Sequence, residues 1–262
     1  MVGPSFFVVE EPLAMDVFPP RSVKFVLSAA LVAIGIRMAA REPVSVALAA
    51  MLLLLLLVPA YLARRRVRNV LRSGDVRSVL SAWSGNLSKL PHPETMGPLI
   101  TAAAFASCGW VEQARTALDR SVRGPAWDAA LEHRLFVETL LDAFEGDREG
   151  ALTKASRLSS LPMPPAGRFM EGRVRVLRGA LAAFARAFAH TSTPEDIDLL
   201  ELASKKSPLV HWAMRYAAAV VAIDHGNPHH AKKLLETAPE WPEGSAFHLF
   251  HEELSRILAA AA

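Results

Sequence analysis

Residues 109–115 read GWVEQAR, and three other segments repeat their pattern: GDVRSVL at 74–80, GDREGAL at 146–152 and GNPHHAK at 226–232. Each segment opens with a glycine and has a small or β-branched residue five positions later. The glycines are spaced by about 35, 37 and 80 residues, and the last interval leaves room for one divergent copy. A period in this range predicts stacked pairs of helices.

Three residue types in these segments have a physical role in a helix pair. Glycine ends the first helix because it adopts a positive φ at no steric cost. Alanine allows two helix axes to approach closely, and proline cannot continue the second helix because it lacks the backbone N–H. The repeat-defining residues are Gly74, Gly109, Ala114, Gly146, Ala151, Gly226 and Ala231.

This arrangement resembles the tetratricopeptide repeat family, in which a glycine turn joins two helices and a proline closes each unit. The resemblance is clearest in one copy, where the matching residues are Ala102, Phe105, Gly109, Ala114, Leu118 and Pro125. The resemblance covers roughly residues 61–242, and it departs from the family pattern at Thr139 and Asp142 in the second full unit. It implies an α-solenoid that binds a protein or peptide partner.

The composition favours an all-α chain. Of 262 residues, 52% are hydrophobic, the mean hydropathy is +0.23, and no stretch alternates apolar and polar residues over strand lengths. The single cysteine, Cys108, excludes an internal disulfide framework. The net charge is only +3, and much of the basic excess adjoins apolar segments rather than forming one stripe. This placement favours lipid headgroups over nucleic acid.

An apolar segment at residues 43–63, PVSVALAAMLLLLLLVPAYLA, carries no charge and predicts a transmembrane helix. Residues 22–40 predict a second span, because Lys24 and Arg37 lie near its ends, where basic side chains can reach the headgroups. The two spans would form a hairpin with both ends in the cytoplasm. The alternative for the earlier segment is a cleaved signal peptide.

A cluster of arginines directly follows the apolar segment, at Arg64, Arg65, Arg66, Arg68 and Arg72. By the positive-inside rule this end of the span is cytoplasmic, although the cluster could also dock on anionic lipid. We therefore expect a tail at 1–21, two transmembrane helices at 22–63 and a repeat domain at 64–262 with a C-terminal capping helix. The expected location is a membrane, of the bacterial inner-membrane kind, with the repeat domain cytoplasmic.

The long helix expected over residues 168–190 has three arginines on one face. Arg168, Arg175 and Arg186 share a face for a turn of 3.6 residues, and apolar residues lie on the opposite side. A row of guanidinium groups could hold a partner's carboxylates. The alternative is an ordinary solvated face.

The strong short motifs of catalysis are missing from the sequence. It contains no Gly-rich phosphate loop, no GxSxG and no HExxH. The late histidines, His225, His229 and His230, have no carboxylate at a convincing ligand spacing. We therefore expect no enzymatic activity, no cofactor and no metal.

Together these features predict a membrane-tethered scaffold or adaptor for protein–protein interaction. The expected partners are a protein or peptide and the lipid bilayer, with no nucleic acid and an oligomeric state that the sequence leaves open. The alternative is an accessory subunit of a larger membrane assembly or export complex, contacted mainly through the transmembrane helices, whose small residues would allow close packing.

Overall fold

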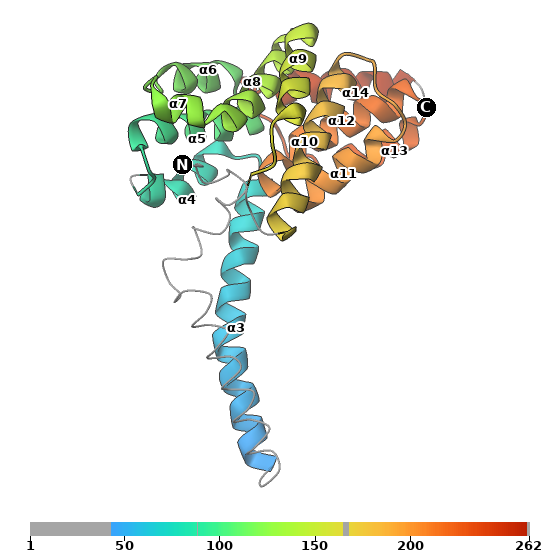
Figure 1. Cartoon of the computed structure of the whole chain (residues 1–262). Coiled ribbons are helices and arrows are strands. Elements are labelled where there is room, and N and C mark those ends of the chain that lie inside the picture. The colour runs from blue at the N-terminus through green and yellow to red at the C-terminus, as the bar shows by residue number, and fades with distance from the viewer. Residues whose placement is uncertain (1–42, 88, 165–167, 261–262) are drawn as a thin grey trace. The chain divides into compact units, whose positions relative to one another are not determined.

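The structure, a computed structural model, describes residues 43–87, 89–164 and 168–260, and every regular element in these ranges is a helix (Figure 1). The all-α prediction is confirmed. In chain order the elements are α3 (Pro43–Arg72), α4 (Val76–Leu87), α5 (Pro93–Ser107), α6 (Val111–Asp119), α7 (Pro125–Ala129), α8 (Leu131–Glu145), α9 (Arg148–Ser160), α10 (Arg168–Phe188), α11 (Asp196–Lys206), the 3₁₀ helix η2 (Pro208–Val210), α12 (His211–Asp224), α13 (Pro228–Leu235) and α14 (Ala246–Ala260).

The chain divides into two compact units, and the boundary lies inside α3. One unit includes α3 as far as Arg68, and the other includes Asn69 and all the helices after it. All four glycine segments therefore belong to the second unit. The sequence placed this boundary at residue 64, about one helical turn earlier.

The prediction of an integral membrane protein is wrong, because no helix among the described residues is both long enough and apolar enough to cross a membrane. The expected span at 22–40 lies outside the described residues. The one at 43–63 is helical and forms the first part of α3, which continues without a break into the arginine-rich stretch from Arg64.

The glycine at the start of each repeated segment adopts a left-handed backbone conformation. The φ angles are 74° at Gly74, 78° at Gly109, 84° at Gly146 and 73° at Gly226. Backbone hydrogen bonds typical of a glycine-terminated helix recur at three of these turns, from Trp110 N to Phe105 O (2.9 Å), Asp147 N to Asp142 O (2.8 Å) and Asn227 N to Ala222 O (2.7 Å). The same turn geometry thus joins α5 to α6, α8 to α9 and α12 to α13.

The residue after the glycine begins the second helix in three of the four segments. Asp147 accepts a hydrogen bond from the Gly150 amide (2.9 Å), and Asn227 accepts one from the His230 amide (3.1 Å). Asp75 accepts one from the Arg77 amide (3.0 Å). Each side chain satisfies an amide that the first helical turn leaves without a partner. A glycine followed by Asp or Asn therefore stops one helix and starts the next.

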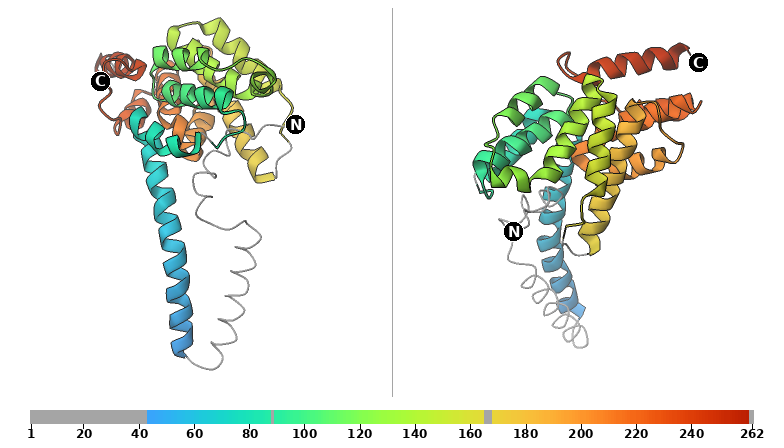
Figure 2. Two further views of the ribbon diagram at one scale, coloured as in Figure 1. Left: turned by 90° about the vertical axis from the view of Figure 1, so that its left-hand side faces the viewer. Right: turned by 45° about the horizontal axis from the view of Figure 1, so that its top comes forward.

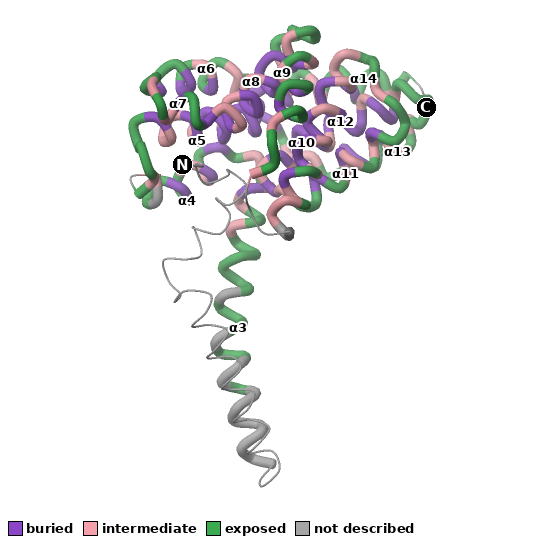
Figure 3. Tube along the Cα trace, viewed as in Figure 1, coloured by how far each residue is buried: buried purple, intermediate pink, exposed green. Residues whose placement is uncertain are grey.

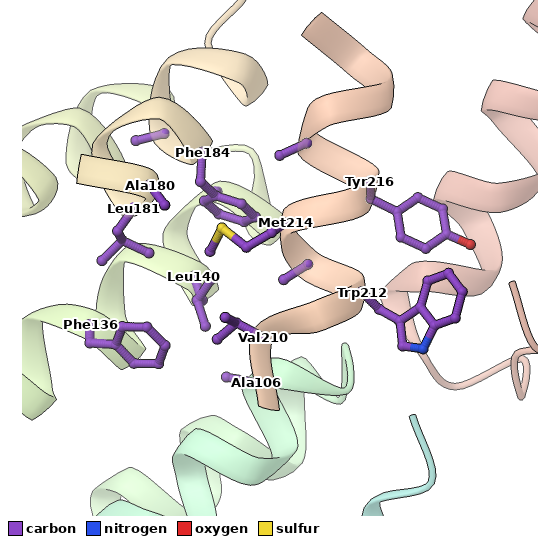
Figure 4. Packing of buried hydrophobic residues seen from close by; sticks show 14 of the residues in the cluster. Ala106, Phe136, Leu140, Ala180, Leu181, Phe184, Val210, Trp212, Met214 and Tyr216 are labelled. Atoms are coloured by element: carbon purple, nitrogen blue, oxygen red, sulfur yellow. The ribbon is translucent and has the colours of Figure 1, made fainter. Parts of the chain in front are cut away.

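The repeat alanines are buried where paired helices meet. Ala114, Ala151 and Ala231 are almost fully inaccessible to solvent, and α5 packs on α6, α8 on α9 and α12 on α13. Figure 3 shows buried positions running through the middle of α8, α10 and α12. The core between these three helices includes Leu140, Phe184 and Met214, which point toward one another in Figure 4.

The divergent copy uses a histidine in place of the turn glycine. His190 has a φ of 55°, and Thr191 N donates to Arg186 O (2.9 Å), the bond that the glycine turns make. His190 Nδ1 also lies 2.9 Å from Asp224 Oδ2. The turn therefore joins α10 to α11 as the glycines join the other pairs, and α10 in turn packs on α9 and α12.

The terminal helix packs over the middle of the second unit. Phe247 of α14 lies 5.4 Å from Phe144 of α8 and 5.0 Å from Tyr216 of α12, between ring centroids. The start of α14 contacts the second glycine turn, since Ala246 N donates to Gly109 O (2.8 Å). In Figure 2, α14 is the red helix that ends at the C-terminus. Leu249 of α14 is exposed.

Candidate functional site

Of the three arginines in the predicted row, Arg186 is bound within the fold. Arg175 is exposed on α10, and the side chain of Arg168 lies outside the described residues. Arg186 binds Asp196 with both nitrogens, Nε to Oδ2 at 3.0 Å and Nη2 to Oδ1 at 2.5 Å. Burial alone would raise the pKa of Asp196, but the bonds from Arg186 and the Thr193 amide lower it. Arg186 therefore stabilises the start of α11.

A different arginine of α10, which the sequence did not single out, is buried. Arg178 is 5% exposed, and its Nε donates to Glu132 Oε1 at 3.0 Å. Its Nη1 donates to Leu161 O (2.6 Å) and its Nη2 to Pro162 O (3.3 Å). Arg178 thus joins α10 to α8 and to the loop after α9, so it has a structural role.

Asp142, one of the departures from the tetratricopeptide pattern, is the centre of an ionic network. Its side chain is 3% exposed and lies 3.0 Å from Arg115 Nη2, and Lys154 Nζ contacts its other oxygen. Arg115 also binds Glu145 at 2.5 Å, and this bond raises the pKa of the guanidinium. The network connects α6, α8 and α9, so the aspartate that breaks the pattern stabilises the packing of two repeats.

The late histidines bind groups within the fold. His225 Nε2 lies 3.1 Å from Ser192 O, His230 Nε2 lies 2.8 Å from Glu201 Oε1, and His229 is exposed. Within the described ranges, no three His, Cys, Asp or Glu side chains are placed so that they could hold a metal ion. His225 therefore connects the α12–α13 turn to the loop before α11, and His230 connects the start of α13 to α11.

Cys108 is buried beside the Gly109 turn and is 2% exposed. Burial raises the pKa of its thiol to about 12, and the charge of Asp75 adds to this effect. A thiol with such a pKa stays protonated at neutral pH, and the thiolate is the nucleophilic form. Cys108 therefore behaves as a small apolar residue of the core.

A shallow groove of about 460 Å³ lies between α5 and α6. Phe105 and Ala117 line it, together with polar side chains such as Glu112, Thr116 and Arg120. The groove is partly open to solvent, unlike the pockets that enclose most of a bound small molecule.

The arginine cluster after the apolar segment falls into both units. Arg64, Arg65, Arg66 and Arg68 are exposed on α3 in the first unit. Arg72 belongs to the second unit, where its Nη2 donates to Lys205 O at 3.0 Å and its carbonyl accepts from Trp212 Nε1 at 2.7 Å. Arg72 therefore contacts α11 and α12 rather than acting with the other four.

Comparison of the chain with protein-family models, with curated proteins and with solved structures finds no match. The functional argument below therefore rests on the residues of this chain.

Proposed function

We propose that the chain is a non-catalytic, helical-repeat interaction module that resembles the tetratricopeptide repeat family and binds a protein or peptide partner. The observation that carries the proposal is the recurrence of one unit: a helix, a left-handed turn at Gly109, Gly146, His190 or Gly226, and a second helix packed on the first. Arrays of such units offer extended surfaces for recognition.

Two further features support a solenoid-like stack. Contacts run mainly between helices that are close in sequence, since α8 packs on α9, α9 on α10, α10 on α11 and α12, and α12 on α13. The polar clusters centred on Asp142 and Arg178 bind neighbouring helices together. Both features favour a rigid scaffold over an enzyme.

A second candidate function is supported by α3. Leu54, Leu55 and Leu57 are more than half exposed on this helix. Apolar side chains in such numbers on one helix favour packing against another protein. On this proposal, the chain is an accessory subunit of a larger assembly, and α3 makes the main contact.

Affinity purification of the full chain, with the bound proteins identified by mass spectrometry, tests the proposed function. We expect a partner that is enriched over a control purification and that remains bound to a Leu54→Glu/Leu55→Glu variant. Loss of the partner from this variant would favour the accessory-subunit function. Absence of any enriched protein would contradict both.

A further inference from the structure

Basic side chains from several helices gather at the C-terminal end of α11. Three of them reach the last carbonyl groups of this helix: His211 Nδ1 lies 2.9 Å from Ser204 O, Arg72 Nη2 donates to Lys205 O (3.0 Å) and Arg173 Nη2 donates to Lys206 O (3.5 Å). Carbonyl groups at a helix C-terminus carry a partial negative charge, so they attract cations. Basic side chains from α3, α10 and α12 thus meet at the C-terminal end of α11.

Arg215 of α12 adjoins this cluster and is a third cation, in addition to Arg72 and Arg173. Its guanidinium carbon lies 5.3 Å from the ring centroid of Trp212, whose Nε1 donates to the Arg72 carbonyl. Arg215 donates to Lys233 O (3.2 Å) and to Thr237 Oγ1 (3.3 Å), which are neutral acceptors. These bonds fix the direction of the guanidinium without cancelling its charge.

At this end of α11 the positive charges of Arg72 and Arg215 repel each other. Burial lowers the pKa of Arg215, and the positive charge of Arg72 lowers it further, against the opposite effect of Glu201. Burial also lowers the pKa of His211, and both Arg72 and Arg215 add to this effect. A carboxylate brought to this surface would relieve the repulsion.

Lysines on α11 extend the cluster to the solvent. Lys205 and Lys206 are exposed, and the Lys205 side chain, 70% exposed, pairs with Glu201 at 3.0 Å. Leu202 is also exposed, and it shares a helix face with both lysines because they follow it by three and four residues. Asp198 lies one turn earlier and bounds the surface on that side. The exposed end of α11 thus combines basic and apolar groups.

We propose that this surface, the α11 basic surface, formed by Arg72, Arg173, Leu202, Lys205, Lys206 and Arg215, binds an acidic segment of a partner protein that carries carboxylates next to an apolar side chain. The proposal deepens the proposed function and rests on it, since it names the chemistry of the partner. Guanidinium groups whose direction is fixed suit carboxylates, and Leu202 offers an apolar contact between the charges.

The aromatic residues argue against nucleic acid as the occupant. Binding of single strands relies on exposed aromatic rings on which bases stack. Trp212 and Trp241 are only 6% and 7% exposed, and their ring nitrogens are already bound within the fold. The surface offers charge without a stacking platform, so it fits a peptide better.

Fluorescence anisotropy with the full chain and a labelled oligoglutamate peptide that contains one central leucine tests the proposal. The test variant is Lys205→Glu/Lys206→Glu, and the control is Arg148→Glu/Arg157→Glu on α9, which makes the same charge change at two exposed arginines. Circular dichroism establishes that both variants fold. We expect the test variant to weaken binding by about tenfold or more, the control by less than about twofold, and Leu202→Ser to weaken it as well.

Three results would overturn the proposal: equal weakening by the test and control variants, no measurable binding of the peptide, or tighter binding of a single-stranded oligonucleotide of the same charge or of anionic lipid vesicles. The co-purification experiment shows whether the α11 basic surface alone is wrong or whether the proposed function is wrong as well. A partner that binds the wild-type chain and the test variant equally contradicts the α11 basic surface alone, whereas the absence of any partner contradicts the interaction module itself.

Discussion

At the scale of single residues, the turn glycines differ in what surrounds them. A Cβ atom at Gly109 would lie 2.5 Å from Ser245 Oγ and 3.2 Å from the Phe247 backbone nitrogen, whereas a Cβ at Gly226 would meet no atom within 4 Å. Both residues have positive φ, so both require glycine for the same backbone reason. Of these two glycines, Gly109 is the one that is also required for close packing, against the segment that leads into α14.

We expect Gly226→Ala to destabilise the protein by about 1–2 kcal/mol, the cost of a left-handed conformation for a residue with a Cβ. Gly109→Ala should cost roughly 1–3 kcal/mol more, because Ser245 and Phe247 must also move. Urea unfolding of the two variants and the wild type measures both values. Equal losses of stability would show that the contact between the Gly109 turn and Ser245 is unimportant.

His190 shows that a turn residue other than glycine can close a repeat. Replacing it by glycine or by alanine removes the same bond to Asp224, and the two variants then differ mainly in how easily they adopt positive φ. We expect His190→Gly to unfold at a higher urea concentration than His190→Ala, by about 1 kcal/mol in stability. An alanine variant as stable as the glycine variant would contradict the left-handed turn at this position.

The glycine pattern predicted the turns at Gly109, Gly146 and Gly226, because glycine adopts a positive φ through its own backbone. The sequence also predicted that the long helix ends near residue 190. It did not predict that His190 takes the left-handed position, because residues other than glycine rarely do so, and the bond to Asp224 that accompanies it comes from another helix.

At the scale of helices, α10 illustrates what periodicity can and cannot predict. The period of 3.6 residues correctly separates an apolar side from a polar one, since Leu177, Leu181 and Phe184 are buried. It cannot predict the partners of the polar side. Arg186 is occupied by Asp196 because the chain reverses after His190, and this reversal is a property of tertiary structure.

Arg178 and Arg175 provide a matched pair on the same helix. Removal of the Arg178 guanidinium leaves Glu132 and two carbonyl oxygens without their donor, so we expect Arg178→Met to destabilise by about 3 kcal/mol or more. Arg175→Met, at an exposed position, should change stability by less than about 0.5 kcal/mol. Thermal unfolding compares them, and similar transition temperatures would argue against the buried network.

The helix α3 is where sequence reasoning failed. A long run of leucines without charge predicted a membrane span, but a transmembrane assignment depends on the whole helix and on its neighbours. The prediction used hydropathy alone, and the described part of α3 continues directly into an exposed arginine-rich stretch. Hydropathy does not reveal which protein surface, if any, covers an apolar helix face.

At the scale of the whole molecule, burial of one histidine links stability to pH. Burial lowers the pKa of His133 in α8 to about 4, compared with 6.5 for the free side chain. Between these two pH values the unfolded chain binds a proton that the folded chain does not bind. The free energy of unfolding therefore decreases as the pH falls from 6.5 to 4.

We expect this linkage to reduce stability by up to about 3 kcal/mol between pH 7 and pH 4. A His133→Leu variant should lose that part of the pH dependence, whereas His229→Leu, at an exposed position, should keep it. Urea unfolding at several pH values provides the measurement. A His133→Leu variant with the same slope as the wild type would show that His133 is not a buried neutral histidine.

The central claim is that this helical array binds a protein partner through the α11 basic surface, and quantitative co-purification tests it most directly. The wild-type chain, Lys205→Glu/Lys206→Glu, Arg148→Glu/Arg157→Glu and Leu54→Glu/Leu55→Glu would be purified in parallel, and their bound proteins quantified by mass spectrometry. The account predicts one enriched acidic partner that is lost only from the Lys205→Glu/Lys206→Glu variant. A partner lost only from the Leu54→Glu/Leu55→Glu variant, or no enriched partner at all, would contradict it.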